Sequence, residues 1–138
     1  MNDINEKLRN SINDVEAGYE YMLAYAAQGL MDEPSSGGSG PSIRVYLERI
    51  QNGLSSITND FEAVINDVTG DNAELYLNYL SVLKEDAVKS HKAITLVMSL
   101  PSIGSQVIDN LNASIHLRAL LTDVFLIDEA LTSLSRHQ

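Results

Sequence analysis

Carboxylates and histidines are the side chains in this sequence whose types and spacing could support chemistry. The 138 residues include 19 aspartates and glutamates, three histidines and no cysteine. Without cysteine this sequence has no disulfide, no thiolate metal ligand and no cysteine nucleophile. Carboxylate chemistry, histidine chemistry and binding through the surface are left to consider.

A ferritin-like dimetal site is the first alternative for the carboxylates. Such a site takes a glutamate from each of two helices and a Glu-x-x-His pair from each of the other two. No glutamate stands three residues before any of the histidines, which are His91, His116 and His137. The candidate glutamates lie off the apolar stripes of their segments, and they are Glu16, Glu20, Glu48, Glu62 and Glu85. Charged residues rarely occupy a core, so we expect these to face water and predict no metal site and no cofactor.

A histidine phosphotransfer domain is the second alternative. His91 lies in the third apolar segment between Lys89 and Lys92, whose charges could hold a phosphoryl group. The pattern typical of that class is His-x-x-Lys-Gly, whereas Ile94 and Thr95 stand at the third and fourth positions here. We therefore expect His91 to be a residue at the edge of the apolar stripe, with phosphorylation as the alternative.

Tyrosine is the most suggestive surface signal. The chain has six tyrosines and no tryptophan, and three of the tyrosines fall close together in the first segment. Tyr19 belongs to the apolar stripe of that segment, while Tyr21 and Tyr25 are four residues apart on its flank. Tyrosine suits interfaces because it combines a large rigid ring with a polar tip. We predict that Tyr21 and Tyr25 bind a partner, or alternatively that their rings pack on a neighbouring helix.

Acidic residues gather in the middle of the chain. Between Arg49 and Lys84 there is no basic residue, yet the stretch carries five acidic ones: Asp60, Glu62, Asp67, Asp71 and Glu74. Such a run is usually a solvated face, and its functional form is an anionic patch that attracts a basic partner. The partner-binding residues that we predict here are Asp60, Glu62, Asp67 and Glu74.

The elements that must position these residues are helices. Apolar residues recur every three or four positions in four segments, about 3–31, 41–68, 72–100 and 102 onward. The second is the most regular: Ile43, Leu47, Ile50, Leu54, Ile57, Phe61, Val64 and Val68. Gly70 suits a helix stop, and short connections favour antiparallel neighbours. We predict an all-α, antiparallel up-down-up-down four-helix bundle with long helices, in one domain over residues 1–138, with a flexible Ser/Gly-rich connection at about 34–40.

The fourth segment is apolar on more than one face, which is typical of a helix that is central or covered by another molecule. Leu117, Leu121 and Phe125 lie in this stretch, and we predict that they form a homodimer interface.

The net charge is −10, from 9 basic and 19 acidic residues. This balance disfavours nucleic acid and an anionic membrane surface as partners. The polar start lacks a secretory pattern, and no stretch approaches the roughly 18 apolar residues of a membrane span. We therefore expect a cytoplasmic, non-enzymatic bundle that acts by protein–protein contact as an adaptor, chaperone, immunity or regulatory protein. The protein partner is expected to be basic or a second copy of the chain.

Overall fold

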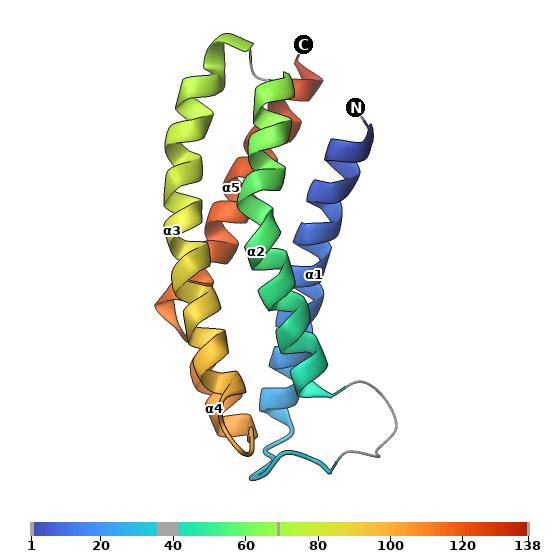
Figure 1. Ribbon diagram of the computed structural model, residues 1–138, viewed down its shortest axis with the longest axis vertical. Helices are drawn as coiled ribbons and strands as arrows, with labels where there is room; N and C mark the ends of the chain where they lie inside the picture. The colour runs from blue at the N-terminus through green and yellow to red at the C-terminus, as the bar shows by residue number, and fades with distance from the viewer. Residues whose placement is uncertain (1, 36–41, 69, 138) are drawn as a thin grey trace.

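The computed structural model describes residues 2–35, 42–68 and 70–137, and these residues form five α-helices and one 3-10 turn with no strand. The helices are α1 (Asn2–Ala27), α2 (Ile43–Val68), α3 (Ala73–Met98), α4 (Ser105–Asn112) and α5 (Ile115–Arg136), and the 3-10 turn is η1 (Gly70–Asn72). The structure therefore confirms an all-α helical bundle (Figure 1). None of the described helices is apolar over enough of its length to cross a lipid bilayer.

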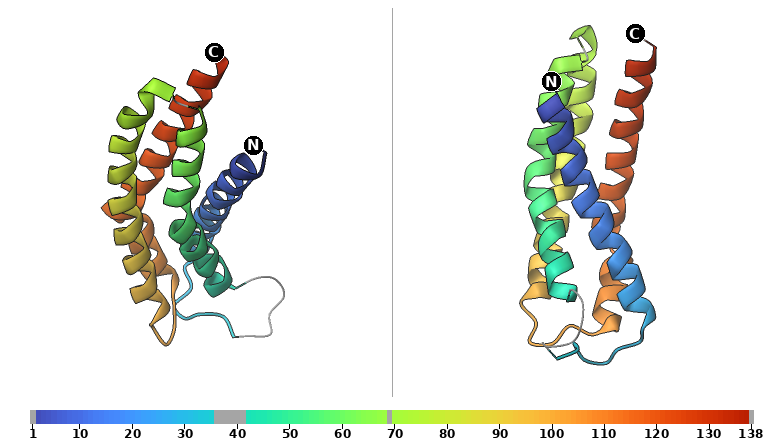
Figure 2. Two further views of the ribbon diagram at one scale, coloured as in Figure 1. Left: turned by 45° about the horizontal axis from the view of Figure 1, so that its top comes forward. Right: turned by 90° about the vertical axis from the view of Figure 1, so that its right-hand side faces the viewer.

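Neighbouring helices pack in a chain: α1 lies on α2, α2 on α3, and α3 on α5, while the short α4 lies on the end of α1. The N-terminal end of α1 stands apart from α3 (Figure 2). Both termini lie at one end of the bundle (Figure 1). One hydrophobic core receives side chains from every α-helix.

The second segment folds as its periodicity predicts. Seven of its eight predicted core residues are buried, and Val68, the last, is half-buried. Gly70 has a φ of +53°, so the predicted left-handed stop is confirmed. The first helix ends at Ala27, earlier than expected, because Gly29 also takes a positive φ, +66°. The centre of the Ser/Gly-rich connection, with Pro41, lies outside the described residues.

The fourth segment is two helices instead of one. The α-helix breaks between Asn112 and Ile115, where Ser114 caps α5 by accepting a hydrogen bond at its Oγ from the backbone N–H of His116 (3.2 Å). Serine is a preferred cap because its hydroxyl satisfies an N–H that the first turn leaves unpaired. Neither proline nor glycine marks this break, which is why the sequence pattern predicted one continuous helix.

Glycine permits the close approach of α1 and α2. A Cβ added at Gly18 would lie 2.2 Å from Ile50 Cγ1, and one added at Gly53 would lie 2.9 Å from Val15 Cγ2. Any larger side chain at either position would therefore push the two helices apart.

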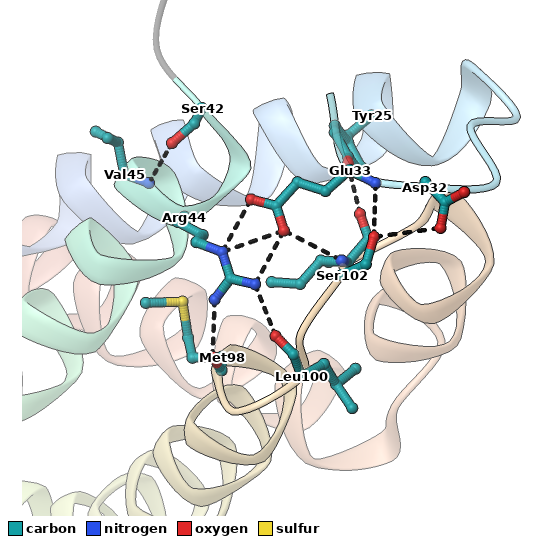
Figure 3. Close-up of polar contacts among 10 residues, drawn as sticks. Tyr25, Asp32, Glu33, Ser42, Arg44, Val45, Met98, Leu100 and Ser102 are labelled. Atoms are coloured by element: carbon teal, nitrogen blue, oxygen red, sulfur yellow. Dashed lines mark hydrogen bonds and ion pairs between the residues drawn. The ribbon is translucent and has the colours of Figure 1, made fainter. Parts of the chain in front are cut away.

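A cluster of polar contacts, which we call the clasp, ties the loops at the end of the bundle opposite the termini (Figure 3). Arg44, in the first turn of α2, donates to both oxygens of Glu33 at 2.8–3.1 Å and to the carbonyls of Met98 (2.8 Å) and Leu100 (2.7 Å). Glu33 also accepts from the backbone N–H of Ile103 at 3.2 Å. The Arg44 hydrogen bonds hold the pKa of Glu33 below its usual value, although partial burial opposes this.

Two further side chains join α1 to α4 beside the clasp. The hydroxyl of Tyr25 donates to the carbonyl of Ile103 at 2.6 Å, and the hydroxyl of Ser105 donates to the carbonyl of Tyr25 at 2.6 Å. The backbone N–H of Leu30 in turn donates to Ser105 Oγ at 2.8 Å. These bonds fix the start of α4 against the end of α1.

Candidate functional site

An apolar groove runs between the first half of α3 and the second half of α5. It holds about 290 Å³ and is lined by Leu75, Tyr76, Tyr79, Leu126, Ile127 and Ala130. Sites for drug-sized ligands are roughly 300–1,000 Å³, so this groove lies at the small end of that range. Its size suits a few apolar side chains from another chain.

Two leucines stand at the groove and remain largely in solvent. Leu75 on α3 is 69% exposed, and Leu126 on α5 is 54% exposed. Tyr76 holds the two helices together below them, because its hydroxyl donates to the carbonyl of Ala130 at 3.3 Å. The groove is therefore fixed in place while part of its apolar surface stays uncovered.

A polar cluster lies between α3 and α5 next to the groove. Tyr79 lines the groove, and its hydroxyl donates to Asp123 Oδ1 at 2.8 Å. Asp123 is only 4% exposed, and the carboxyl of Asp86 on α3 interacts with it. Burial and the neighbouring carboxyl of Asp86 raise the pKa of Asp123 to about 7, although the Tyr79 hydrogen bond favours the ionised form.

Asp123 is a buried carboxylate that was not among the candidate residues predicted from the sequence. The sequence pattern contained a signal for Asp123, which stands three residues after Leu120 and four before Ile127 on the buried stripe of α5. The five glutamates considered as metal ligands are exposed or half-buried, as expected. Among the described residues there is no group of three or more histidines or acidic residues placed to hold a metal ion.

The two tyrosines predicted to form a surface ridge occupy different environments. Tyr25 is 2% exposed and donates to a backbone carbonyl, so it belongs to the core and cannot line a surface ridge. Burial, followed by the nearby Glu33, raises its pKa. Tyr21 is half-buried and stacks on Tyr46 of α2, with ring centroids 4.1 Å apart. For Tyr21 the alternative, a ring packed on a neighbouring helix, describes what the structure shows.

The predicted acidic patch divides into one bonded residue and three exposed ones. Asp60 is half-buried and accepts from the hydroxyl of Ser11 at 2.5 Å, so this carboxylate joins α2 to α1. Glu62, Asp67 and Glu74 are exposed near the turn between α2 and α3. Leu75 of the groove follows Glu74 directly, so one of these acidic residues is a sequence neighbour of the apolar surface.

The residues predicted for a dimer interface also differ in exposure. Leu117 is 1% exposed and lies in the core, so it cannot contact a second chain in this fold. Leu121 is half-buried, and Phe125 is 64% exposed. Much of the apolar character of the fourth segment is thus used within the bundle, and Phe125 and Leu126 are what remains at the surface of the second half of α5.

His91 is half-buried on α3, as its place at the edge of the apolar stripe predicts. Its Nδ1 lies 3.4 Å from the hydroxyl of Thr95, which also donates to the His91 carbonyl at 2.9 Å. His91 lines a shallow hollow between α2 and α3 together with Lys84 and Val88. Lys84 is thus a basic side chain that lines the same hollow as His91.

Comparisons of the chain with protein-family models, with curated proteins and with solved structures found no match. The groove, the polar cluster and the acidic residues are the features of the described chain that bear on its function.

Proposed function

We propose that this protein is a non-enzymatic helical bundle that acts by binding another protein, and that the groove between α3 and α5 is the contact site. The observation that carries the proposal is the exposure of Leu75 (69%) and Leu126 (54%) at one apolar groove. Apolar anchors in a preformed pocket supply most of the affinity in many interfaces. Two helices with an apolar groove between them also suit a partner that inserts the apolar face of a helix.

The first partner that we propose is a second copy of the chain. A symmetric dimer would bury the same groove twice, because each copy offers the same surface. Phe125 immediately precedes Leu126 on α5, and its exposed ring adds to the apolar surface available to such a dimer. We also propose that α4 and α5 together form the fourth member of an antiparallel four-helix bundle. The location that we propose for the protein is the cytoplasm.

Light scattering on the purified chain tests the dimer. The monomer has a mass of 15.1 kDa, so we expect a species of twice that mass at high micromolar concentration. The double change Leu75→Asp and Leu126→Asp should return it to the monomer mass. Leu23→Asp is the matched control, because Leu23 is also a half-exposed leucine (48%) but lies on α1, outside the groove.

A basic partner protein is the second candidate, and the exposed Glu62, Asp67 and Glu74 favour it, with Glu74 next to Leu75 of the groove in the sequence. Capture from a lysate of the native host would then recover a protein that the groove variant loses and Leu23→Asp keeps. Raising the salt concentration should weaken the complex, because exposed charges are screened within about 10 Å at 0.1 M salt. Equal recovery by both variants would remove the groove from the proposal.

The ferritin-like and phosphotransfer alternatives receive less support from the geometry. No group of potential metal ligands comes together in the described part of the chain, and the side chain that contacts the His91 ring is the neutral Thr95. Elemental analysis after growth in iron- and manganese-rich medium would test the first. Acid-labile phosphate that disappears in His91→Gln would support the second.

A further inference from the structure

Asp123 is the one acidic side chain that is buried within the described part of the chain. It is 4% exposed and lies in α5 among core residues such as Leu120 and Ile127. Removing an ionised carboxylate from water costs several kcal/mol unless the charge is compensated. The negative charge of a buried aspartate must therefore be compensated by its surroundings or removed by a proton.

The hydrogen bonds of Asp123 are incomplete if both carboxyls of the pair are ionised. Oδ1 accepts from the Tyr79 hydroxyl at 2.8 Å, but Oδ2 is buried and has no donor. The carboxyl that reaches Asp123 is that of Asp86, and two ionised carboxylates are both acceptors, so neither can donate to the other. A proton on Asp123 makes this carboxyl a donor, so that the two carboxyls can share an O–H···O hydrogen bond.

We propose that the buried carboxyl of Asp123 keeps its proton at neutral pH, and that this proton holds α5 against α3. Loss of the proton leaves two negative carboxylates facing each other in a largely buried site, which weakens the contact between the two helices. Tyr79 belongs both to this cluster and to the groove, so the same proton supports one wall of the groove. The proton site does not depend on whether the groove binds a protein.

No basic group neutralises the pair from the helices around it. α3 contributes Tyr79 and Asp86, and Lys89, one turn beyond Asp86, is exposed. The buried residues of α2 are apolar apart from Gly53, and those of α4 are Ser105, Ile108, Leu111 and Asn112, none of which titrates.

On α1, Arg9 contacts α5, but it pairs with Asp128 at 3.2 Å and not with Asp123. On α5 itself, His116 lies two turns before Asp123 and is exposed. None of these basic side chains neutralises Asp123, which agrees with its raised pKa of about 7.

Loss of the proton lowers the stability of the folded protein as the pH rises. Because the folded protein holds this proton up to about pH 7 while an unfolded aspartate releases it near pH 4, the folded state binds more protons between these values. Stability from the pair is full below about pH 4 and is lost as the pH rises through 7. Between pH 5 and pH 8 this amounts to a fall of about 10 °C in the melting temperature of a chain of this length.

Carboxyl carbon chemical shifts in the 13C-labelled full-length chain measure the proton directly. We expect the Asp123 carboxyl to titrate within about one pH unit of neutrality, well above the exposed aspartates. In Asp86→Asn the Asp123 midpoint should fall by at least one unit, because an amide N–H then donates to the carboxylate. An Asp123 midpoint near pH 4 in the wild-type chain would overturn the proposal without any variant.

Melting temperatures between pH 5 and pH 8 test the link to the helix contact. Asp123→Asn resembles the protonated residue, since its amide can accept from Tyr79 and donate to Asp86. We expect this variant to lose the fall of about 10 °C relative to the wild-type chain. Asp128→Asn, on the same helix but outside the pair, should keep it. The same pH dependence in wild type and Asp123→Asn would show that the proton does not hold α5.

Discussion

Replacing Arg44 by methionine should destabilise the protein far more than the same change at Arg49. Both arginines lie on α2 and both form ion pairs with carboxylates that come from outside this helix. They differ in burial: the Arg44 and Glu33 side chains are 33% and 18% exposed, whereas those of Arg49 and Asp14 are 41% and 39% exposed. Methionine keeps most of the apolar stem, so the comparison isolates the guanidinium.

The loss of unfolding free energy in each variant depends on the partners that the arginine leaves unpaired. Arg44 makes five hydrogen bonds, three to Glu33 and two to backbone carbonyls, those of Met98 at the end of α3 and of Leu100 in the following loop. Removing one partner of a fully buried ion pair costs roughly 3–5 kcal/mol, and a third of this arginine is in solvent. We therefore expect Arg44→Met to cost about 3 kcal/mol. An exposed pair such as Arg49–Asp14 contributes roughly 0.2–1 kcal/mol.

Urea unfolding followed by circular dichroism would measure the difference. With an m-value of roughly 2 kcal/mol/M, the Arg44→Met midpoint should fall by about 1.5 M and the Arg49→Met midpoint by less than about 0.5 M. The double variant Arg44→Met with Glu33→Gln should be less destabilised than the sum of the two single variants, because the pair is shared. Equal midpoints for the two methionine variants would refute the reasoning that the clasp secures this end of the bundle.

Two further substitutions test the packing described above. Tyr25→Phe removes the hydroxyl that donates to Ile103 and should cost roughly 1–2 kcal/mol of unfolding free energy, because it leaves a buried carbonyl without that donor; an unchanged urea midpoint would contradict it. Gly18→Ala places a Cβ 2.2 Å from Ile50 Cγ1 and should cost roughly 1–3 kcal/mol, whereas helix propensity alone predicts a gain for alanine, so the sign of the change in melting temperature decides between them.

The helical architecture could be predicted from the sequence because one strong signal dominates it. An unbroken spacing of three and four between apolar residues specifies which face of α2 is buried, and the structure buries seven of the eight residues so identified. The break between α4 and α5 could not be predicted in this way. It depends on Ser114 and on how α4 packs against the end of α1, and apolar periodicity contains neither fact.

The candidate site was harder to predict, because it depends on contacts between helices. Tyr25 lies on the edge of its stripe, and its hydroxyl bonds the Ile103 carbonyl 78 residues away, a contact that no local pattern contains. Asp123 was passed over because aspartate seldom occupies a core, although its spacing from Leu120 and Ile127 placed it on the buried face. Exposure of Leu75 and Leu126 likewise follows from how α3 and α5 are rotated against each other.

The clasp has a consequence for how the chain folds. Its bonds and those beside it join residues far apart in sequence: Glu33 to Ile103 spans 70 residues, and Tyr25 to Ser105 spans 80. Closing loops of that length costs conformational entropy before any contact repays it, so these bonds form only after α2 and α3 have brought the loops together. The α1–α2 and α2–α3 pairs are local and need no such closure. These long-range bonds therefore form after the α1–α2 and α2–α3 pairs, and the amide hydrogens of Ile103 and Leu30 report on that later step.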